Sequence, residues 1–210
     1  MLSGFITFEG IEGSGKTTQI GLLSQALHAR SIAHVLTREP GGTPAGDRIR
    51  GLLLDPATRL APLAELLLYA AARAEHLERL IRPALAAGRM VLCDRYLDAT
   101  RAYQGAGRGL PIAWIEAIHQ VEPLRLAPDT TLLLDLDPGV GLERARGRNA
   151  RGGQEEGRFE AEDLPFHRRV REGYLALAKA APQRFRVVDA SGDPEAVQRR
   201  IQEALCISAA

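Results

Sequence analysis

Residues 10–17 read Gly10-Ile11-Glu12-Gly13-Ser14-Gly15-Lys16-Thr17, a complete G-x-x-x-x-G-K-T phosphate-binding loop. An apolar run at 5–8 precedes the loop, and a helical pattern follows it. In this order a strand leads into a tight turn whose backbone N–H groups face inward, and the next helix directs its positive end to the same point. The alternative is a chance glycine-rich turn before a helix.

Lys16 and Lys179 are the only lysines among 27 basic residues. A chain that otherwise uses arginine has a compact ammonium in the loop, where a point charge suits the outer phosphates of a nucleotide and a planar guanidinium does not. The hydroxyl of Thr17 is expected to bind Mg²⁺. The loop therefore predicts a nucleoside triphosphate site.

The 210 residues predict one domain, 1–210, with room for a small lid. The formal charge of +1 is spread along the chain, so we expect no nucleic acid polymer and no membrane as partner. The two cysteines have no metal-like spacing, and Cys93 lies in an apolar run, which favours a small core residue in a reducing compartment. Neither a signal peptide nor a membrane span is predicted, and a cytoplasmic location is expected.

Short β-rich runs alternate with longer helical patterns along the chain. Strands are expected at 4–8, 34–37, 90–93, 131–136 and 186–188. Helices are expected at 16–30, 46–54, 63–87, 112–121, 140–148, 164–181 and 195–205. This alternation predicts an α/β fold with a parallel sheet between helices, and ligands in such sheets bind beyond the carboxyl ends of the strands.

The longest helical pattern spans 60–87, and Pro83 is expected to bend or interrupt it. Its apolar positions are Leu63, Leu66, Leu67, Ala70, Ala74, Leu77, Leu80 and Ile81. A stripe of this kind indicates core packing, and its breadth also allows a helix–helix dimer seam.

Residues 144–158 contain five arginines and four glycines. This composition is typical of a mobile loop rather than a packed element. One interpretation is a solvated charged loop. The other is a lid whose arginines close over transferring phosphates.

Asp94 ends the apolar run at 90–93 and is followed by Arg95 and Tyr96. A carboxylate at the end of a strand next to the phosphate loop can hold Mg²⁺ directly or through water, and Arg95 would face the same cleft. The alternative is an aspartate that only caps a turn.

Three segments are candidates for binding the phosphoryl acceptor. Residues 37–43 combine Arg38, which can bind a phosphate through its planar guanidinium, with Pro40 and two glycines. The alternative is a turn of the same composition that only connects a strand to a helix. Tyr69 and Arg73 lie four apart on one helix face and suit a planar base, but the pair is weak alone. Residues 98–108 are polar and glycine-rich, and include Thr100, Tyr103 and Gln104.

Four motifs in this order resemble the thymidylate kinase family: F-E-G-x-E-G-S-G-K-T-T, T-R-E-P-G-G-T, D-R-Y and A-Y-Q-G-x-G-R-G. The resemblance runs from about residue 5 to residue 178. It implies transfer of the γ-phosphoryl group of Mg·ATP to dTMP, giving dTDP and ADP. It also implies the three-layer P-loop nucleoside-monophosphate kinase fold, with a five-stranded parallel sheet and a mobile lid, and a homodimer formed through the long helix 62–87.

The resemblance also implies the site residues. The ATP-binding set is Gly10, Ile11, Glu12, Gly13, Ser14, Gly15, Lys16, Thr17 and Thr18. The dTMP-binding set is Glu12, Arg38, Pro40, Tyr69, Arg73, Arg95, Thr100, Tyr103 and Gln104, and the metal set is Thr17 and Asp94. Within these sets Arg38 and Arg95 bind the dTMP phosphate, Tyr69 stacks on the base, and Arg73 donates to the thymine edge.

Other roles follow from the same resemblance. Thr100 and Gln104 contact base or sugar, Tyr103 crowds the ribose 2′ position, Glu12 approaches the acceptor's sugar, and the Pro40 bond is cis in relatives. Bacterial members without a loop arginine carry catalytic arginines in the lid, and this chain has Glu12-Gly13 in the loop. The expected catalytic residues are therefore Lys16, Arg38, Arg95, Arg146, Arg148 and Arg151. The lid departs from the family's D-R-F-E ending, because Gly157 precedes Arg158-Phe159-Glu160 and a Gly-Gly-Gln-Glu-Glu stretch is added.

The acceptor chemistry predicts no general base, since a phosphate monoester is largely deprotonated near neutral pH, its second pKa being about 6. Two alternatives stay open at this point. One is another nucleoside-monophosphate or deoxynucleoside kinase. The other is a P-loop nucleotide switch, which would need an N-K-x-D guanine-binding segment that this sequence lacks.

Overall fold

The computed structural model describes residues 4–149 and 157–207, which fold around one five-stranded sheet. All four strand pairings are parallel, and the strand order is β2-β3-β1-β4-β5. The strands are β1 (Phe5–Glu9), β2 (His34–Arg38), β3 (Met90–Asp94), β4 (Thr130–Asp135) and β5 (Phe185–Asp189). The predicted five-stranded parallel sheet between helices is confirmed, with every strand end within one residue of the expected one.

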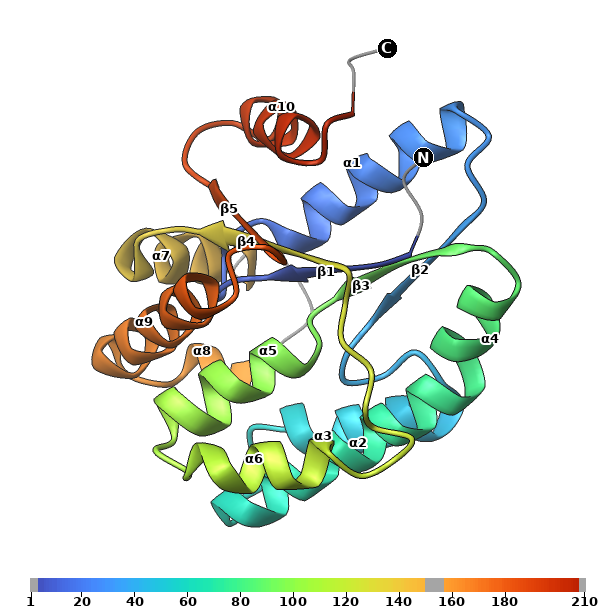
Figure 1. The fold of residues 1–210 in the computed structure, drawn as a ribbon. Coiled ribbons are helices and arrows are strands. Elements are labelled where there is room, and N and C mark those ends of the chain that lie inside the picture. The colour runs from blue at the N-terminus through green and yellow to red at the C-terminus, as the bar shows by residue number, and fades with distance from the viewer. Residues whose placement is uncertain (1–3, 150–156, 208–210) are drawn as a thin grey trace.

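Helices cover both faces of this sheet (Figure 1). On one side lie α1 (Lys16–Ala29) and α10 (Pro194–Ala204), which pack against each other and on the sheet. The remaining helical elements of the described chain are α2 (Pro44–Leu54), α3 (Pro62–His76), η1 (Leu77–Ile81), α4 (Arg82–Ala86), α5 (Leu97–Thr100), η2 (Arg101–Gly107), α6 (Ile112–His119), α7 (Pro138–Asn149), α8 (Gly157–Glu160) and α9 (Leu164–Ala180).

The core consists of two buried apolar clusters, and the first includes side chains from both faces of the sheet, from α1 on one side and α9 on the other (Figure 1). Phe8, Leu92 and Leu132 belong to the cluster under α1 and α9, and Phe5 and Val91 belong to the cluster under α3 and η1. Along β3 the side chains alternate between the two clusters, with Met90 and Leu92 in the first and Val91 and Cys93 in the second, because successive side chains of a strand point to opposite faces. Strands covered on both faces are continuous apolar runs, which is why their sequences were recognisable.

The expected interruption of the long helix takes the form of a π-helical turn. The helix changes from α3 to η1 at Leu77, and α4 begins at Arg82, directly before Pro83. Proline has no N–H to donate and its ring collides with the carbonyl four residues earlier, so a regular α-helix cannot continue through it. The wider turn of η1 absorbs this mismatch without ending the helical path.

A second π-helical segment, η2, lies where the sequence showed only a polar, glycine-rich stretch. Together α5 and η2 make residues 97–107 helical, and η2 packs closely on α9. A Cβ on Gly107 would lie 2.7 Å from the ring of Phe166, so glycine is what allows this close approach. Tertiary packing therefore overrides the low helix propensity of the segment.

The expected loop at 144–158 is wrong at both of its ends. Residues 144–149 extend α7, and residues 157 and 158 begin α8, while 150–156 lie outside the described residues. Leu142 and Ala145 of α7 are buried, and arginine is a good helix former, so the helix predicted at 140–148 prevails over the loop where the two expectations overlapped. Among the described helices, none is long and apolar enough to cross a membrane.

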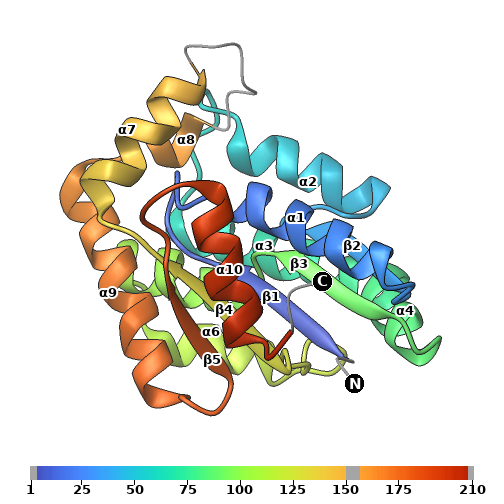
Figure 2. The ribbon, with the colours of Figure 1, turned by 90° about the horizontal axis from the view of Figure 1, so that it is seen from above.

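Strand register brings the site residues to one edge of the sheet. Arg38 at the end of β2 pairs with Asp94 at the end of β3, which pairs with Phe8 of β1, one residue before Glu9 and the phosphate loop. Carboxyl ends of parallel strands meet at the same edge, so three segments distant in sequence converge there. Figure 2 shows α7 and α8 beyond this end of β1.

Candidate active site

The phosphate loop joins the end of β1 to the start of α1. Gly13 and Gly15 have positive φ of 71° and 90°, a region that glycine enters without strain, and a Cβ on Gly13 would collide with the carbonyl of Gly141 in α7. No side chain caps the start of α1. Its first N–H groups therefore face the loop without a partner side chain, which is the arrangement that binds a phosphate.

Lys16 lies inside the ring of the loop. Its Nζ donates to the carbonyls of Gly10 at 3.1 Å and Ile11 at 2.9 Å, and lies 3.5 Å from the hydroxyl of Ser14. Burial and the nearby charge of Arg95 lower the pKa of Lys16 to about 8. A phosphate anion in the loop would oppose both effects, so the site favours a negatively charged ligand.

Thr17 and Asp94 are adjacent, although one follows β1 and the other ends β3. The Thr17 hydroxyl donates to Asp94 Oδ2 at 3.0 Å. Thr18 is exposed on the next position of α1, and Ile11 is buried in the core. The pair of oxygen ligands is open to solvent next to Lys16.

One cavity of about 300 Å³ opens beside the loop. All nine residues of the expected dTMP-binding set line it, together with Gly13, Lys16, Thr17 and Asp94. The further lining residues are Glu39, Arg50, Leu54, Tyr96, Ala99, Phe159 and Glu160. The fold thus gathers residues from β2, α3, β3, η2 and the loop around one space.

Arg95 projects into the cavity from the turn after β3. Its backbone has a positive φ of 69°, and its guanidinium donates to Glu12 at 3.0 Å and to the carbonyl of Gly10 at 3.0 Å. The same group lies over the ring of Tyr103, 4.8 Å from the centroid. A non-glycine residue at positive φ costs energy, so these contacts must hold the turn in place.

Glu12 is bound by several donors at once. Tyr103 donates to its two oxygens at 2.7 and 2.8 Å, and His167 of α9 lies 3.3 Å from Oε2. Burial alone would raise the pKa of Glu12, but the His167 contact and the charges of Arg95 and Lys16 outweigh it and lower the pKa to about 2. Glu12 is therefore a fixed negative charge in the cavity wall.

Arg73 is 1 % exposed and is held on three sides. Its Nε donates to Glu39 at 2.8 Å, its Nη2 to Thr100 at 3.0 Å, and its Nη1 lies 2.7 Å from Nε2 of His119. Burial and the charge of Arg73 lower the pKa of His119 to about 4, so the ring is neutral. Nδ1 of His119 faces the carbonyl of Ile115, which leaves Nε2 as the acceptor for Arg73.

The other expected acceptor-site residues lie around this group. Tyr69 is one helical turn before Arg73 on α3, Pro40 follows a cis Glu39–Pro40 peptide bond, and Arg38 lies at the rim, 56 % exposed and 3.4 Å from Asp47. Gln104 donates to the buried Glu65 at 2.9 Å.

Comparison with known proteins identifies the family. The family model described as thymidylate kinase matches residues 8–201. A thymidylate kinase of Pelobacter propionicus is 55 % identical over 199 residues, covering 94 % of this chain and 91 % of the relative. A crystal structure of thymidylate kinase from Ehrlichia chaffeensis is 34 % identical, with a TM-score of 0.76 and coverage of 97 % of this chain and 98 % of that one.

The chain belongs to the thymidylate kinase family. Relatives from Syntrophotalea carbinolica and Geobacter are 55 % and 54 % identical over 95 % and 96 % of this chain. The enzyme class predicted from the motifs, a kinase that acts on a nucleotide, is confirmed, as is the expected P-loop kinase fold.

Of the expected catalytic arginines of the lid, only Arg146 has a described side chain, and it is not among the residues that line the cavity. Arg146 is exposed on α7, nothing is described of the Arg148 side chain, and Arg151 lies outside the described residues. Arg158, on α8, binds the carbonyl of Leu53 at 2.9 Å and Glu65 at 2.6 Å.

Several residues of the thymidylate kinase site carried no role in the sequence interpretation. Glu9 and Glu39 lie within the motifs quoted above. A carboxylate directly after an apolar strand, or within a turn, could have indicated a role at the site. His119, His167 and Tyr174 lie on helices with no motif around them, and only the tertiary structure brings them to the site.

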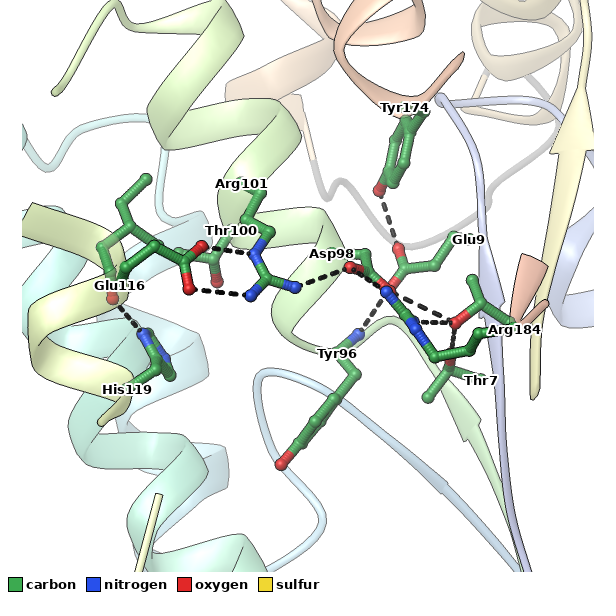
Figure 3. A network of polar contacts seen from close by, with 12 residues as sticks. Thr7, Glu9, Tyr96, Asp98, Thr100, Arg101, Glu116, His119, Tyr174 and Arg184 are labelled. Carbon is green, nitrogen blue, oxygen red and sulfur yellow. Dashed lines mark hydrogen bonds and ion pairs between the residues drawn. The ribbon is translucent and has the colours of Figure 1, made fainter. Parts of the chain in front are cut away.

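Glu9 lies between Tyr96, which follows β3, and Tyr174 of α9 (Figure 3). It is fully buried and accepts from the backbone N–H of Tyr96 at 2.8 Å and from the hydroxyl of Tyr174 at 2.7 Å. Arg95 in turn lies 3.3 Å from the same hydroxyl. Burial and the neighbouring Asp98 carboxylate raise the pKa of Glu9 to about 8.

We predict that Glu9→Gln removes a pH-dependent part of the stability. Because the folded pKa lies near 8 and the ordinary value is 4.5, the stabilisation from the bound proton is complete below pH 4.5 and is lost as the pH rises towards 8. Each tenfold change in proton affinity is worth about 1.4 kcal/mol, so glutamine should gain a few kcal/mol over glutamate across that range. Urea unfolding at pH 5 to 9 measures this, with Glu195→Gln on the surface as control; a constant wild-type-to-variant difference would contradict it.

Proposed function

We propose that this protein transfers the γ-phosphoryl group of Mg·ATP to dTMP and produces dTDP and ADP. The observation that carries the proposal is the single cavity that joins the phosphate loop, through Lys16 and Thr17, to a base-sized compartment with Tyr69 and Arg73 in its wall. Membership of the thymidylate kinase family supports the same reaction.

Electrostatics is the main catalytic requirement in this proposal. Donor and acceptor are both phosphate anions, so their repulsion must be cancelled before they can approach in line. Lys16 binds the outer phosphates of ATP, and Arg38 and Arg95 bind the phosphate of dTMP. The acceptor oxygen is largely deprotonated near neutral pH, its second pKa being about 6, so the reaction needs no general base.

Thr17 and Asp94 would hold Mg²⁺ together with the phosphates of ATP. A hydroxyl and a carboxylate in contact at 3.0 Å are hard oxygen ligands of the kind that magnesium prefers, and magnesium sites of this class take only one or two protein ligands. The ion, when bound, would neutralise charge on the bridging and terminal phosphate oxygens.

The acceptor nucleoside is recognised by the far wall of the cavity. Tyr69 stacks on thymine, Arg73 donates to the base, and Pro40, Thr100 and Gln104 complete the base and sugar contacts. In this proposal Glu12 and Tyr103 would face the deoxyribose, and the Tyr103 ring would crowd the ribose 2′ position. Tyr103 is fixed for this task by its bonds to Glu12 and by edge contacts with Phe159 and Phe166.

We predict that Lys16→Ala lowers kcat by at least about 100-fold, the usual loss when a group that stabilises transition-state charge is removed. Lys179→Ala is the matched control, because Lys179 is the chain's other lysine and is exposed in the last turn of α9. Steady-state ADP release with dTMP as acceptor, on variants with unchanged melting temperature, is the measurement. Near-normal kcat in Lys16→Ala would refute the proposed phosphate site.

We propose that arginines of the segment 144–158 complete the charge on the transferring group, with Arg146, Arg148 and Arg151 as catalytic residues. The support is indirect: α7 begins against the phosphate loop, where Gly141 touches Gly13, and Arg146 and Arg148 lie on this helix. Phe159 and Glu160, which follow the segment, already line the cavity.

Single replacement of Arg146, Arg148 and Arg151 by alanine tests this idea. At least one variant should lose kcat by about 100-fold with little change in KM for dTMP, since the contact forms mainly in the transition state. Arg125→Ala, in the loop before β4 at the opposite edge of the sheet, is the control. If all three variants match the control, the solvated-loop interpretation is the correct one.

We propose that two copies associate through the long helix. The apolar stripe predicted there divides in two: Leu66, Leu77 and Ile81 are buried in the core, whereas Leu63 and Leu67 are 44 % and 50 % exposed, one turn apart on α3. An exposed apolar pair on a helix is a surface that a second copy can bury.

Sedimentation equilibrium should show a dimer for the wild type and a monomer for Leu67→Glu. The new carboxylate would lie unpaired and without water at the centre of an apolar interface, which is costly. Ile112→Glu is the control, since Ile112 is equally exposed on α6. A monomeric wild type, or a Leu67→Glu variant that stays dimeric, would rule this interface out.

A further inference from the structure

Glu65 is a buried carboxylate for which the proposed reaction has no role. It lies on α3 one turn before Tyr69 and two turns before Arg73, and it is 1 % exposed. Its Oε2 binds Arg158 at 2.6 Å, and its Oε1 binds Arg108 at 3.4 Å and accepts from the side-chain amide of Gln104 at 2.9 Å. A buried charge needs paired partners, and these two guanidiniums supply them.

The two arginines fix how Glu65 can bond. Glu65 is the acceptor towards both guanidiniums, and a carboxylate only accepts hydrogen bonds. The amide of Gln104 must therefore turn its NH₂ group towards Glu65. Its carbonyl oxygen, Oε1, then points the other way, and Gln104 is one of the residues that line the cavity.

The neighbouring Arg73 has the opposite character. A guanidinium has five N–H donors and cannot accept. Three of its nitrogens are already occupied by Glu39, His119 and Thr100, with one N–H left on each Nη. Thr100 lies one turn before Gln104, so Arg73 and Gln104 face the same end of the cavity.

A donor beside an acceptor selects one type of pyrimidine edge. Thymine and uracil present a carbonyl acceptor at C4 and an N–H donor at N3. Cytosine presents the reverse, an amino donor at C4 and an acceptor at N3. With Arg73 as donor and Gln104 Oε1 as acceptor, the cytosine edge would meet like groups at both positions, and unpaired buried polar groups are what makes such discrimination strong.

We propose that Glu65 is a positioning residue for base selection: it holds the Gln104 amide with its oxygen towards the cavity and so makes the site prefer a 4-oxo pyrimidine to a 4-amino pyrimidine. The inference rests on the proposed function, because it concerns the acceptor nucleotide of that reaction. It adds that specificity depends on a residue that does not touch the nucleotide.

Glu65→Gln is the decisive change. The amide oxygen would stay on the short bond to Arg158, and the new NH₂ group would face Gln104. Gln104 would then turn its own NH₂ group to the cavity, which suits N3 of cytosine. The ratio of kcat/KM for dTMP over dCMP should fall roughly 10- to 100-fold, through a higher KM for dTMP with a smaller change in kcat.

Two comparisons distinguish a reorientation of the Gln104 amide from general damage to the acceptor site. dUMP has the same edge as dTMP, so the dTMP-to-dUMP ratio should stay within about twofold of wild type while the dTMP-to-dCMP ratio falls. Glu162→Gln is the control variant, because Glu162 binds Arg108 at 2.6 Å and has no contact with Gln104. It should keep wild-type ratios for both acceptors.

A double-mutant cycle tests whether Glu65 acts through Gln104. In a Gln104→Met background, the further change Glu65→Gln should no longer alter the dTMP-to-dCMP ratio. If Glu65→Gln does not fold, Glu65→Asp is the second variant. Aspartate keeps the negative charge that both arginines need, but its shorter side chain places the carboxylate farther from Gln104. The dTMP-to-dCMP ratio should then also fall.

The outcomes are distinct. An active, folded Glu65 variant with an unchanged dTMP-to-dCMP ratio would overturn the positioning role, and so would an equal fall in the dTMP-to-dUMP ratio or in the Glu162 control. A wild-type enzyme that phosphorylates no dTMP would instead overturn the proposed function itself.

Discussion

The repulsion between buried cations is the constraint around which this site is built. Lys16, Arg73 and Arg95 all line one cavity; Lys16 and Arg73 are buried, and the Arg95 side chain is 20 % exposed. Without a ligand such charges would destabilise the fold, since an uncompensated buried charge is among the most costly features of a protein interior. Carboxylates compensate two of these charges: Glu39 forms an ion pair with Arg73, and Glu12 forms one with Arg95.

These pairs also prepare the cavity for its ligand. Arg95 has fixed partners on three sides, so for the phosphate binding that we propose the guanidinium would already be in place, with little side-chain freedom left to lose. Glu12 stays ionised at any physiological pH because of its lowered pKa. In the reaction that we propose, the phosphate of dTMP would therefore share Arg95 with an existing carboxylate, which would limit how tightly product is held and favour turnover over tight binding.

The sequence was sufficient for the fold and for much of the cavity wall, for identifiable reasons. The neighbouring strands β1 and β3 are mostly apolar runs, and the phosphate loop has fixed spacing. The positions of β1, β3 and α1 could therefore be predicted directly. Tyr69 and Arg73 are one turn apart, which local periodicity reveals. The partners that hold Arg73 were out of reach, because His119 is 46 residues away from it and its acceptor role depends on which ring nitrogen Ile115 engages.

The helical conformation of residues 97–107 and the two π-helical turns could not be predicted from the sequence either, and these features position residues of the cavity. The segment 97–107 has a composition typical of a loop, yet packing of η2 on α9 makes it helical and sets Thr100, Tyr103 and Gln104 on the face that borders the cavity. A π-helical turn has more residues per turn than an α-helix, so spacing rules for an α-helix misplace its side chains. Such turns occur often at functional sites, and here one follows Arg73 in the long helix while the other carries Tyr103 and Gln104. The irregular helices thus position the residues that we propose recognise the base, while the regular sheet positions those that we propose bind phosphate.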